Sequence, residues 1–294
     1  MAIPASQARK QLRRALVPSE FLKELSAELA SGDVRLPSFP AIAERVQRAL
    51  EDPRATPVQV ARVIGIDAAL AVRVLRLANS AFLNPSAKPI TELQQAVNRL
   101  GHQLVRCTAV SFALQQMNAG DGVAALRPRL QELWRKGTLV ASIAYVLARE
   151  TRAANPDEAL VAGLMHNIGS LYIAVRAHQH GAVLGADDAA TQVLNNGHPR
   201  IAGAILGHWK FAPSIVSAVS NQNASNLPTG AVGLADVLIA SISLVPCVFF
   251  RGLLDETVTA VAAFQRLALD TTECTRLLRT TARQIKSLHG ALAG

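Results

Sequence analysis

One short stretch of the chain has residues that could do metal chemistry: GLMHNIGS, Gly163 to Ser170. It places His166 at the end of an apolar helix. A histidine followed by an acidic residue there indicates a metal site, in which the ion lowers the pKa of a bound water and makes a nucleophile at neutral pH. The residue that follows is Asn167, whose neutral amide oxygen supports a divalent ion poorly. We expect His166 to be a core histidine hydrogen-bonded near a helix C-terminus, with a ligand contact as the alternative.

The other reactive side chains do not complete a catalytic set. His178 and His180 are two residues apart, so a helix would direct them to different sides. His198 and His208 are expected to cap helices or to lie on the surface. Ser170 lies outside any G-x-S-x-G motif, and the sequence contains no Walker loop and no G-x-G-x-x-G. The sequence therefore predicts no catalytic residues.

The composition predicts an all-α protein without a membrane span. The chain has 294 residues, of which 50% are hydrophobic and 4% aromatic, and the apolar residues recur at helical spacing. The apolar run Gly233–Phe250 contains Asp236 and Pro246, so we expect a buried core helix there. Three scattered cysteines and an N-terminus without an apolar signal region indicate a cytoplasmic location.

The elements that must position His166 are predicted from capping residues and breaks. Thr56, Asp67 and Asn155 are the expected N-caps of three helices, and Gly101 separates two further helices. The clearest linker is NAGDG, Asn118–Gly122. We therefore predict a two-lobed helical bundle, made up of an N-terminal helix (1–35), an N-terminal lobe (36–120), a second lobe (121–232) and C-terminal helices packing on the second lobe (233–294).

The charge suggests two kinds of partner. The net charge of +9 attracts anions in general, including nucleic acid and acidic protein surfaces. Near the C-terminus, Arg276, Arg279, Arg283 and Lys286 recur at helical spacing, either as a solvated helix face or as a docking surface.

A DNA-binding helix-turn-helix at residues 56–79 is an alternative, and it needs polar side chains on its second helix to read base edges. Only Arg73 and Arg76 could do so there. The other residues of that helix suit burial, so nucleic acid is a possible but not a favoured partner.

The order of several motifs resembles the HDOD family of bacteria, a catalytically degenerate relative of the HD metal phosphohydrolases. The motifs extend over Leu36 to Asn223 and run LPSFP, IGIDAALAVRVLRLANSAF, PITELQQAVNRLG, ELWRKG, AGLMHNIG and GHPRIAGAILGHWKF. The resemblance implies two helical lobes, the second one HD-like, and a bacterial regulator of signal transduction.

The resemblance also implies where an HD enzyme would hold its metals. The first histidine position falls on Lys136, the His-Asp doublet on His166 and Asn167, and the distant aspartate on Asp236. A protonated lysine has no lone pair and repels a divalent ion. In this degenerate HD pocket we expect Lys136 to pair with Asp236 in place of the metals, or to receive a phosphate together with Arg135.

Two further positions are implied by the same family motifs. Histidines that some HD variants use downstream match 221–223, which is Asn-Gln-Asn. Trp134 and Trp209 are expected to be core anchors of the HD-like lobe, with ligand stacking as the alternative.

Together these observations predict a non-enzymatic signalling module that works by binding another signalling protein. No metal and no cofactor are expected. The alternatives are a residual metal-dependent phosphohydrolase and a nucleic-acid-binding regulator.

Overall fold

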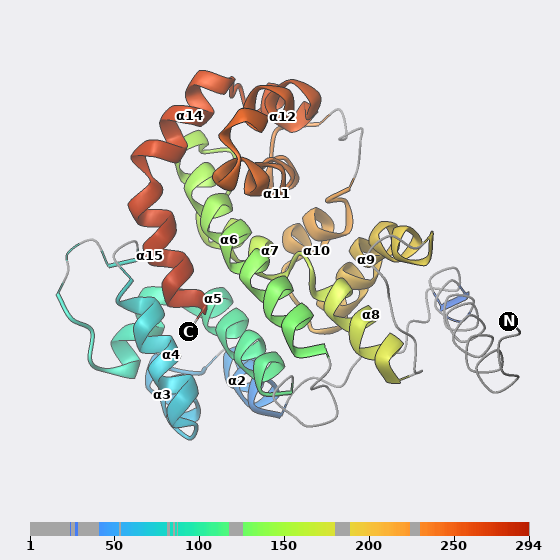
Figure 1. The fold of residues 1–294 in the computed structure, drawn as a ribbon. Helices are drawn as coiled ribbons and strands as arrows, with labels where there is room; N and C mark the ends of the chain where they lie inside the picture. The colour runs from blue at the N-terminus through green and yellow to red at the C-terminus, as the bar shows by residue number, and fades with distance from the viewer. Residues whose placement is uncertain are drawn as a thin grey trace, which may run out of the picture.

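A computed structural model describes residues 24, 27–28, 41–52, 54–80, 83–84, 86, 88–117, 126–179, 189–223 and 230–293. In these residues the chain is helical and has no β-strand, which confirms the predicted all-α class (Figure 1). The elements are α2 (Ala41–Glu51), α3 (Pro57–Ile64), α4 (Ala68–Ala78), α5 (Leu93–Met117), α6 (Arg127–Thr151), α7 (Pro156–Met165), α8 (Ile168–Gln179), α9 (Ala189–His208), α10 (Pro213–Ser220), α11 (Leu234–Phe249), the short 3₁₀ helix η2 (Arg251–Leu253), α12 (Leu254–Ala260), α13 (Ala262–Arg266), α14 (Thr271–Thr280) and α15 (Ala282–Ala293).

The three predicted N-caps are confirmed. The side chain of Thr56 accepts from the backbone N–H of Gln59, whose side chain accepts in return from the Thr56 N–H, a capping box. Asp67 caps α4, and the Oδ1 atom of Asn155 lies 2.8 Å from the backbone N of Asp157 at the start of α7. These caps satisfy backbone donors that have no partner inside the helix.

The predicted break at Gly101 appears as a kink within α5. Gly101 has φ 69° and ψ 172°, a backbone conformation that a side chain disfavours. The kinked helix packs with α2, α3 and α4 and also contacts α7. The kink thus lets one chain segment serve both the N-terminal helices and the helices around His166.

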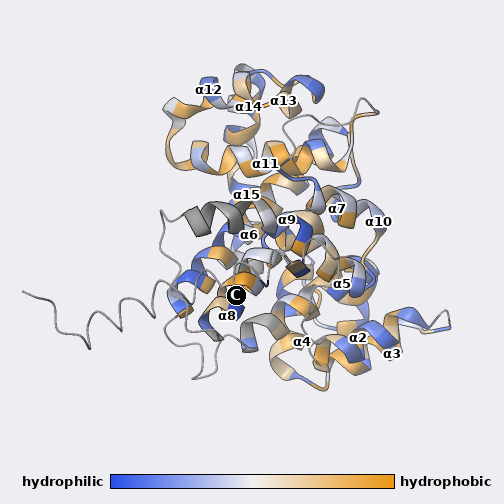
Figure 2. Cartoon of the chain, turned by 90° about the vertical axis from the view of Figure 1, so that its right-hand side faces the viewer, coloured by the Kyte–Doolittle hydropathy of each residue, from blue (hydrophilic) through white to orange (hydrophobic). Residues whose placement is uncertain are grey.

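The hydrophobic core is continuous from α2 to α15. α6 runs through the middle of it, with α7, α11 and α15 packed along its length (Figure 1). The helices carry both apolar and hydrophilic residues, as expected for elements that bury one face (Figure 2). Gly163 permits the close approach of α7 to α6, because a Cβ atom there would lie 2.5 Å from the Cα atom of Ala141.

The described helices do not test the predicted division of the chain into an N-terminal helix, two lobes and C-terminal helices. Most of the N-terminal segment 1–35 and all of the linker Asn118–Gly122 lie outside the described residues. The division into lobes stays a prediction.

The apolar run Gly233–Phe250 forms α11, whose face against the core is buried, as predicted. Its last turn is more open, and Phe249 is 57% exposed. Among the described residues, the segment Pro156–His178 alone is long and apolar enough to cross a membrane, and 72% of its 18-residue apolar window is buried inside the protein.

Candidate functional site

His166 lies at the end of α7 and is only 2% exposed. Its Nδ1 atom is 2.6 Å from the backbone carbonyl oxygen of Gly163. Because a carbonyl oxygen only accepts, we infer that Nδ1 carries the proton and Nε2 the lone pair. The expected core histidine, hydrogen-bonded near a helix C-terminus, is therefore confirmed.

Three groups surrounding His166 set its charge. Burial lowers the pKa of its imidazole to about 3, the hydrogen bond to Gly163 partly opposes this shift, and the nearby Lys136 and His198 add to it. Burial and Lys136 also lower the pKa of His198, to about 4. Both imidazoles are therefore neutral at pH 7, and a cation lies close to each.

His198 is the site residue that sequence reasoning missed. It was expected to cap a helix or to lie on the surface, yet its Nδ1 atom is buried and has no hydrogen-bond partner among the described residues. Contact between α8 and α9 brings it there, since a Cβ atom at Gly169 would lie 2.1 Å from the carbonyl oxygen of His198. Its position in the motif GHPRIAGAILGHWKF is the signal that could have identified it.

Asn167 uses its amide to join two helices. The side chain is 5% exposed, and its Nδ2 atom donates to the carbonyl oxygen of Leu133 in α6 at 2.6 Å. Gly137 of α6 lies close to the end of α7, because a Cβ atom there would lie 3.3 Å from the carbonyl oxygen of Leu164. An ionised aspartate could not donate this hydrogen bond, so the amide fits a structural role.

Gln222, in the triplet where some HD variants carry histidines, also acts on the backbone. Its Nε2 atom donates to the carbonyl oxygens of His166 at 2.7 Å and Val219 at 2.9 Å. Since the side chain is buried, these two bonds hold the end of α7 against α10.

The predicted ion pair between Lys136 and Asp236 is wrong. Asp236 is buried at the start of α11 and accepts from Arg266 of α13, with 2.5 Å between Arg266 Nε and Asp236 Oδ1. It also accepts from the backbone N–H of Gly233. Arg266 lies 30 residues further along the chain and gave no local sequence signal. The structure thus brings together Lys136, His166 and Asn167 but ties Asp236 to a different partner.

This donor set does not fit the metal that an HD site implies. In the described part of the chain, no three His, Cys, Asp or Glu side chains lie close enough to hold an ion together. Lys136 is exposed, yet its charge lowers the pKa of both His166 and His198, and the same charge disfavours a divalent cation beside them. The arrangement can fix helix ends and keep two imidazoles neutral, and it presents no carboxylate to a metal.

The two tryptophans agree with their predicted role as core anchors. Trp209 is 1% exposed, and Trp134 packs against the core from its edge. The guanidinium carbon of Arg73 lies 5.9 Å from the centres of the Trp134 and Phe112 rings. Arg73 is therefore held between aromatic rings, and Arg76 alone of the two predicted base-reading residues is exposed.

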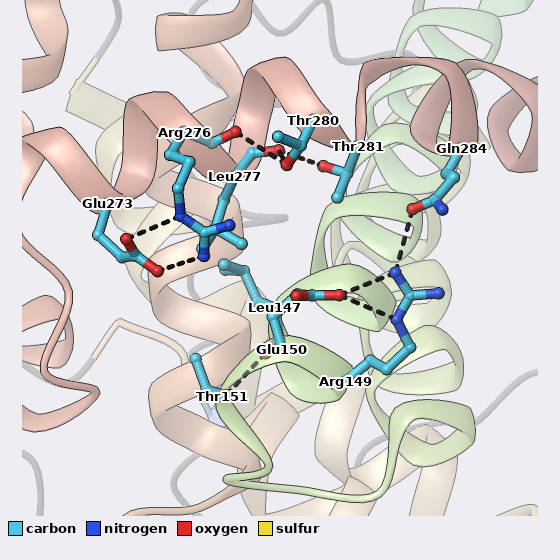
Figure 3. Close-up of polar contacts among 10 residues, drawn as sticks. All are labelled: Leu147, Arg149, Glu150, Thr151, Glu273, Arg276, Leu277, Thr280, Thr281 and Gln284. Carbon is cyan, nitrogen blue, oxygen red and sulfur yellow. Dashed lines mark hydrogen bonds and ion pairs between the residues drawn. The ribbon is translucent and has the colours of Figure 1, made fainter.

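The spacing of the basic stripe suggested a single helix, but its residues lie on two helices. Arg276 and Arg279 belong to α14, and Arg283 and Lys286 to α15. The helix ends at Thr281, which has φ −102° and ψ 2°, and the hydroxyls of Thr280 and Thr281 hydrogen-bond the carbonyl oxygens of the preceding turn (Figure 3).

The four cations of the stripe differ in their surroundings. Arg276 is paired with Glu273 at 2.5 Å. Arg279 and Lys286 line a cavity between α6, α11, α12, α14 and α15, and Arg283 is exposed. The stripe thus contains one neutralised residue and two that border a cavity.

Comparison with known proteins supports the family resemblance. The sequence model of the HDOD domain matches residues 36–225. A curated protein of Treponema pallidum (strain Nichols) is 24% identical over 219 residues, which is 70% of this chain. The chain spans 40% of that protein's length.

Two solved structures share the fold. The crystal structure of a candidate metal-dependent phosphohydrolase from Shewanella amazonensis SB2B has a TM-score of 0.75 and 23% identity, covering 94% of this chain and 99% of that one. A candidate signal transduction protein from Marinobacter aquaeolei VT8 has a TM-score of 0.54 and 21% identity, covering 95% of this chain and 66% of that one. At these identities the likeness concerns the fold.

Proposed function

The chain belongs to the HDOD family, and on that premise we propose that it is a non-enzymatic signal-transduction module that acts by binding another signalling protein in the cytoplasm. In this proposal its HD-like pocket, formed by Lys136, His166 and Asn167, is degenerate. In it the N-terminal helices and the helices around His166 form two lobes, and the partner binds either the cleft between them or the basic stripe of α14 and α15.

The position of Lys136 is the observation that carries this proposal. Its charge is close enough to lower the pKa of both His166 and His198. A positive charge that acts on both imidazoles also disfavours a divalent cation beside them. Asp236, the carboxylate expected to help hold such an ion, is paired with Arg266 instead.

The side chains around the doublet are also already used. Asn167 donates to Leu133 and Gln222 donates to the carbonyl oxygen of His166. These buried bonds use the amide N–H groups of Asn167 and Gln222 to hold helix ends in place, and removing one would cost about 1–3 kcal/mol for the polar group left unpaired. The site therefore suits a rigid support better than an ion-binding centre.

Metal binding and hydrolysis test the non-enzymatic part of the proposal. The purified protein is incubated with Mn²⁺ or Fe²⁺, desalted, and assayed for bound metal and for hydrolysis of phosphomonoesters and phosphodiesters. We expect no stoichiometric metal and no metal-dependent turnover. Retention of one ion or more per chain, with turnover that the variant His166→Ala loses, would establish the residual phosphohydrolase instead.

A restored variant provides the matched control. Lys136→His with Asn167→Asp puts back the two missing ligand types, and we expect it to bind more metal than the native chain. This comparison shows that the assay detects a metal when the pocket can hold one.

The partner is tested with the basic stripe. Arg283 is exposed on α15 and Arg76 is exposed on α4. Arg283→Glu should weaken capture of a specific protein from the source bacterium, while Arg76→Glu should not. Equal capture by both variants would place the contact surface elsewhere.

A further inference from the structure

The cavity bordered by the basic stripe has a volume of about 530 Å³, within the range of small-molecule sites. It lies between α6, α11, α12, α14 and α15, away from His166. Its floor is apolar and includes the buried side chains of Leu139, Cys247, Leu254 and Ile285.

Every charged side chain that lines this cavity is a cation: Arg135, Arg279 and Lys286. All three are exposed, so they stand at the mouth rather than on the floor. The guanidinium carbon of Arg135 lies 5.9 Å from the centre of the Phe249 ring, which keeps that charge at the wall. The remaining basic side chain, His289, has a pKa lowered by burial and by Arg135.

Among the described residues, the cations at the mouth have no carboxylate partner. Within the described ranges, Arg279 and Lys286 have no ion-pair or hydrogen-bond partner, and neither has the exposed Arg283 outside the cavity. Two other arginines nearby are paired: Arg276 with Glu273, and Arg149 with Glu150 and, by a further hydrogen bond, with Gln284 (Figure 3). The charges at the mouth are therefore not neutralised by these carboxylates and can meet an anion.

We propose that this cavity binds a small amphipathic anion, with one apolar chain against the floor and a carboxylate or phosphate at the mouth between Arg279, Lys286 and Arg135. Burial of the chain contributes about 25 cal/mol per Å² of apolar surface. The cations attract the charged head group. Because Ile285 is buried and the neighbouring Lys286 is exposed, the apolar chain points inward and the head group points to solvent. The cavity lining does not include His166, so the proposal does not rest on the HD-like pocket, although Arg279 and Lys286 also belong to the basic stripe.

Dodecanoate is the probe, added below its micelle concentration and followed by isothermal titration calorimetry on the full chain. We expect saturable one-to-one binding that weakens as salt is added. Dodecanol has the same chain without the charge and should bind about tenfold more weakly. Dodecyl phosphate should bind in the same place and compete with dodecanoate.

Substitutions at the mouth locate the site. Arg279→Gln with Lys286→Gln should weaken dodecanoate binding about tenfold, while Arg283→Gln, which removes an exposed cation of the same helix outside the cavity, should leave it unchanged. Ala282→Phe fills the space from its lining and should abolish binding.

Three results would overturn the proposal. One is the absence of binding by the native chain. Another is equal affinity for dodecanoate and dodecanol in all variants, which would mean that the cations do not contribute to recognition of the charged head group. The third is binding to acidic phospholipid vesicles without binding of monomeric dodecanoate, which would make this face a membrane contact.

Discussion

The Nδ1 atom of His166 and the carbonyl oxygen of Gly163 lie 2.6 Å apart within one turn of helix. The turn that ends α7 therefore satisfies one of its own carbonyl groups with a side chain. This fixes the tautomer of His166, and the buried ring stays neutral beside the charge of Lys136. Stability should respond to pH because of this arrangement.

Acid should destabilise the protein before its carboxylates are protonated. His166 and His198 have pKa values of about 3 and about 4 in the folded state, against 6.5 for an ordinary histidine. Between these values the unfolded chain binds more protons, so the free energy of unfolding falls as the pH drops below 6.5. Each histidine contributes up to about 1.4 kcal/mol per pH unit. Urea unfolding from pH 7.5 to 4.5 measures the slope.

Variants separate this effect from general acid sensitivity. His198→Gln should reduce the slope by up to about 1.4 kcal/mol per pH unit, whatever its effect on stability at pH 7. His208→Gln, at an exposed position in the same helix, should leave the slope unchanged. An unaltered slope in His198→Gln would contradict the assignment.

The contact between α8 and α9 should not tolerate a methyl group. Gly169→Ala would place a Cβ atom 2.1 Å from the carbonyl oxygen of His198, so the helices must separate. We expect a loss of about 1–3 kcal/mol in the free energy of unfolding. Gly207→Ala meets nothing within 4 Å and should be neutral or stabilise the helix by up to about 1 kcal/mol. Chemical denaturation of both variants checks the contrast.

A double-mutant cycle should assign the partner of Asp236. Arg266→Gln and Asp236→Asn should each lower the melting temperature and should be strongly non-additive, because they remove one ion pair. Lys136→Gln and Asp236→Asn should be additive within about 0.5 kcal/mol. Coupling between Lys136 and Asp236 would restore the ion pair expected from the sequence.

Arg73 should matter for folding rather than for nucleic acid. Arg73→Ala removes the aliphatic part of the side chain and its contacts with the Trp134 and Phe112 rings, and should lower the free energy of unfolding by about 1–2 kcal/mol. The fluorescence of Trp134 should also change. Arg76→Ala, on the exposed side of α4, should stay within about 0.5 kcal/mol of the native chain. Salt-dependent DNA affinity that Arg76→Ala abolishes would instead support a nucleic-acid partner.

The parts of the fold that depend on neighbouring residues could be predicted from the sequence. Thr56, Asp67 and Asn155 cap their helices because each needs only donors two or three residues away. Gly101 bends α5 through its own backbone conformation, which also depends on local sequence alone. The burial of His166 followed from its place at the end of an apolar helix.

The parts that depend on distant residues could not be predicted. Arg266 reaches Asp236 only because α13 folds back on the start of α11, and periodicity does not show which helices meet. His198 lies near His166 because Gly169 allows two helix backbones to touch. The basic stripe is divided between two helices because α14 ends at Thr281, although threonine is acceptable inside a helix.

α15 has a practical consequence for anyone who expresses part of this protein. It packs on both α6 and α4, yet it lies beyond residue 225, where the family match ends (Figure 1). A recombinant fragment truncated at that boundary would expose apolar surface on both helices and would tend to aggregate. If such a fragment proved insoluble or inactive, the loss of α15 would explain it, and the result would not be evidence against the function of the intact chain.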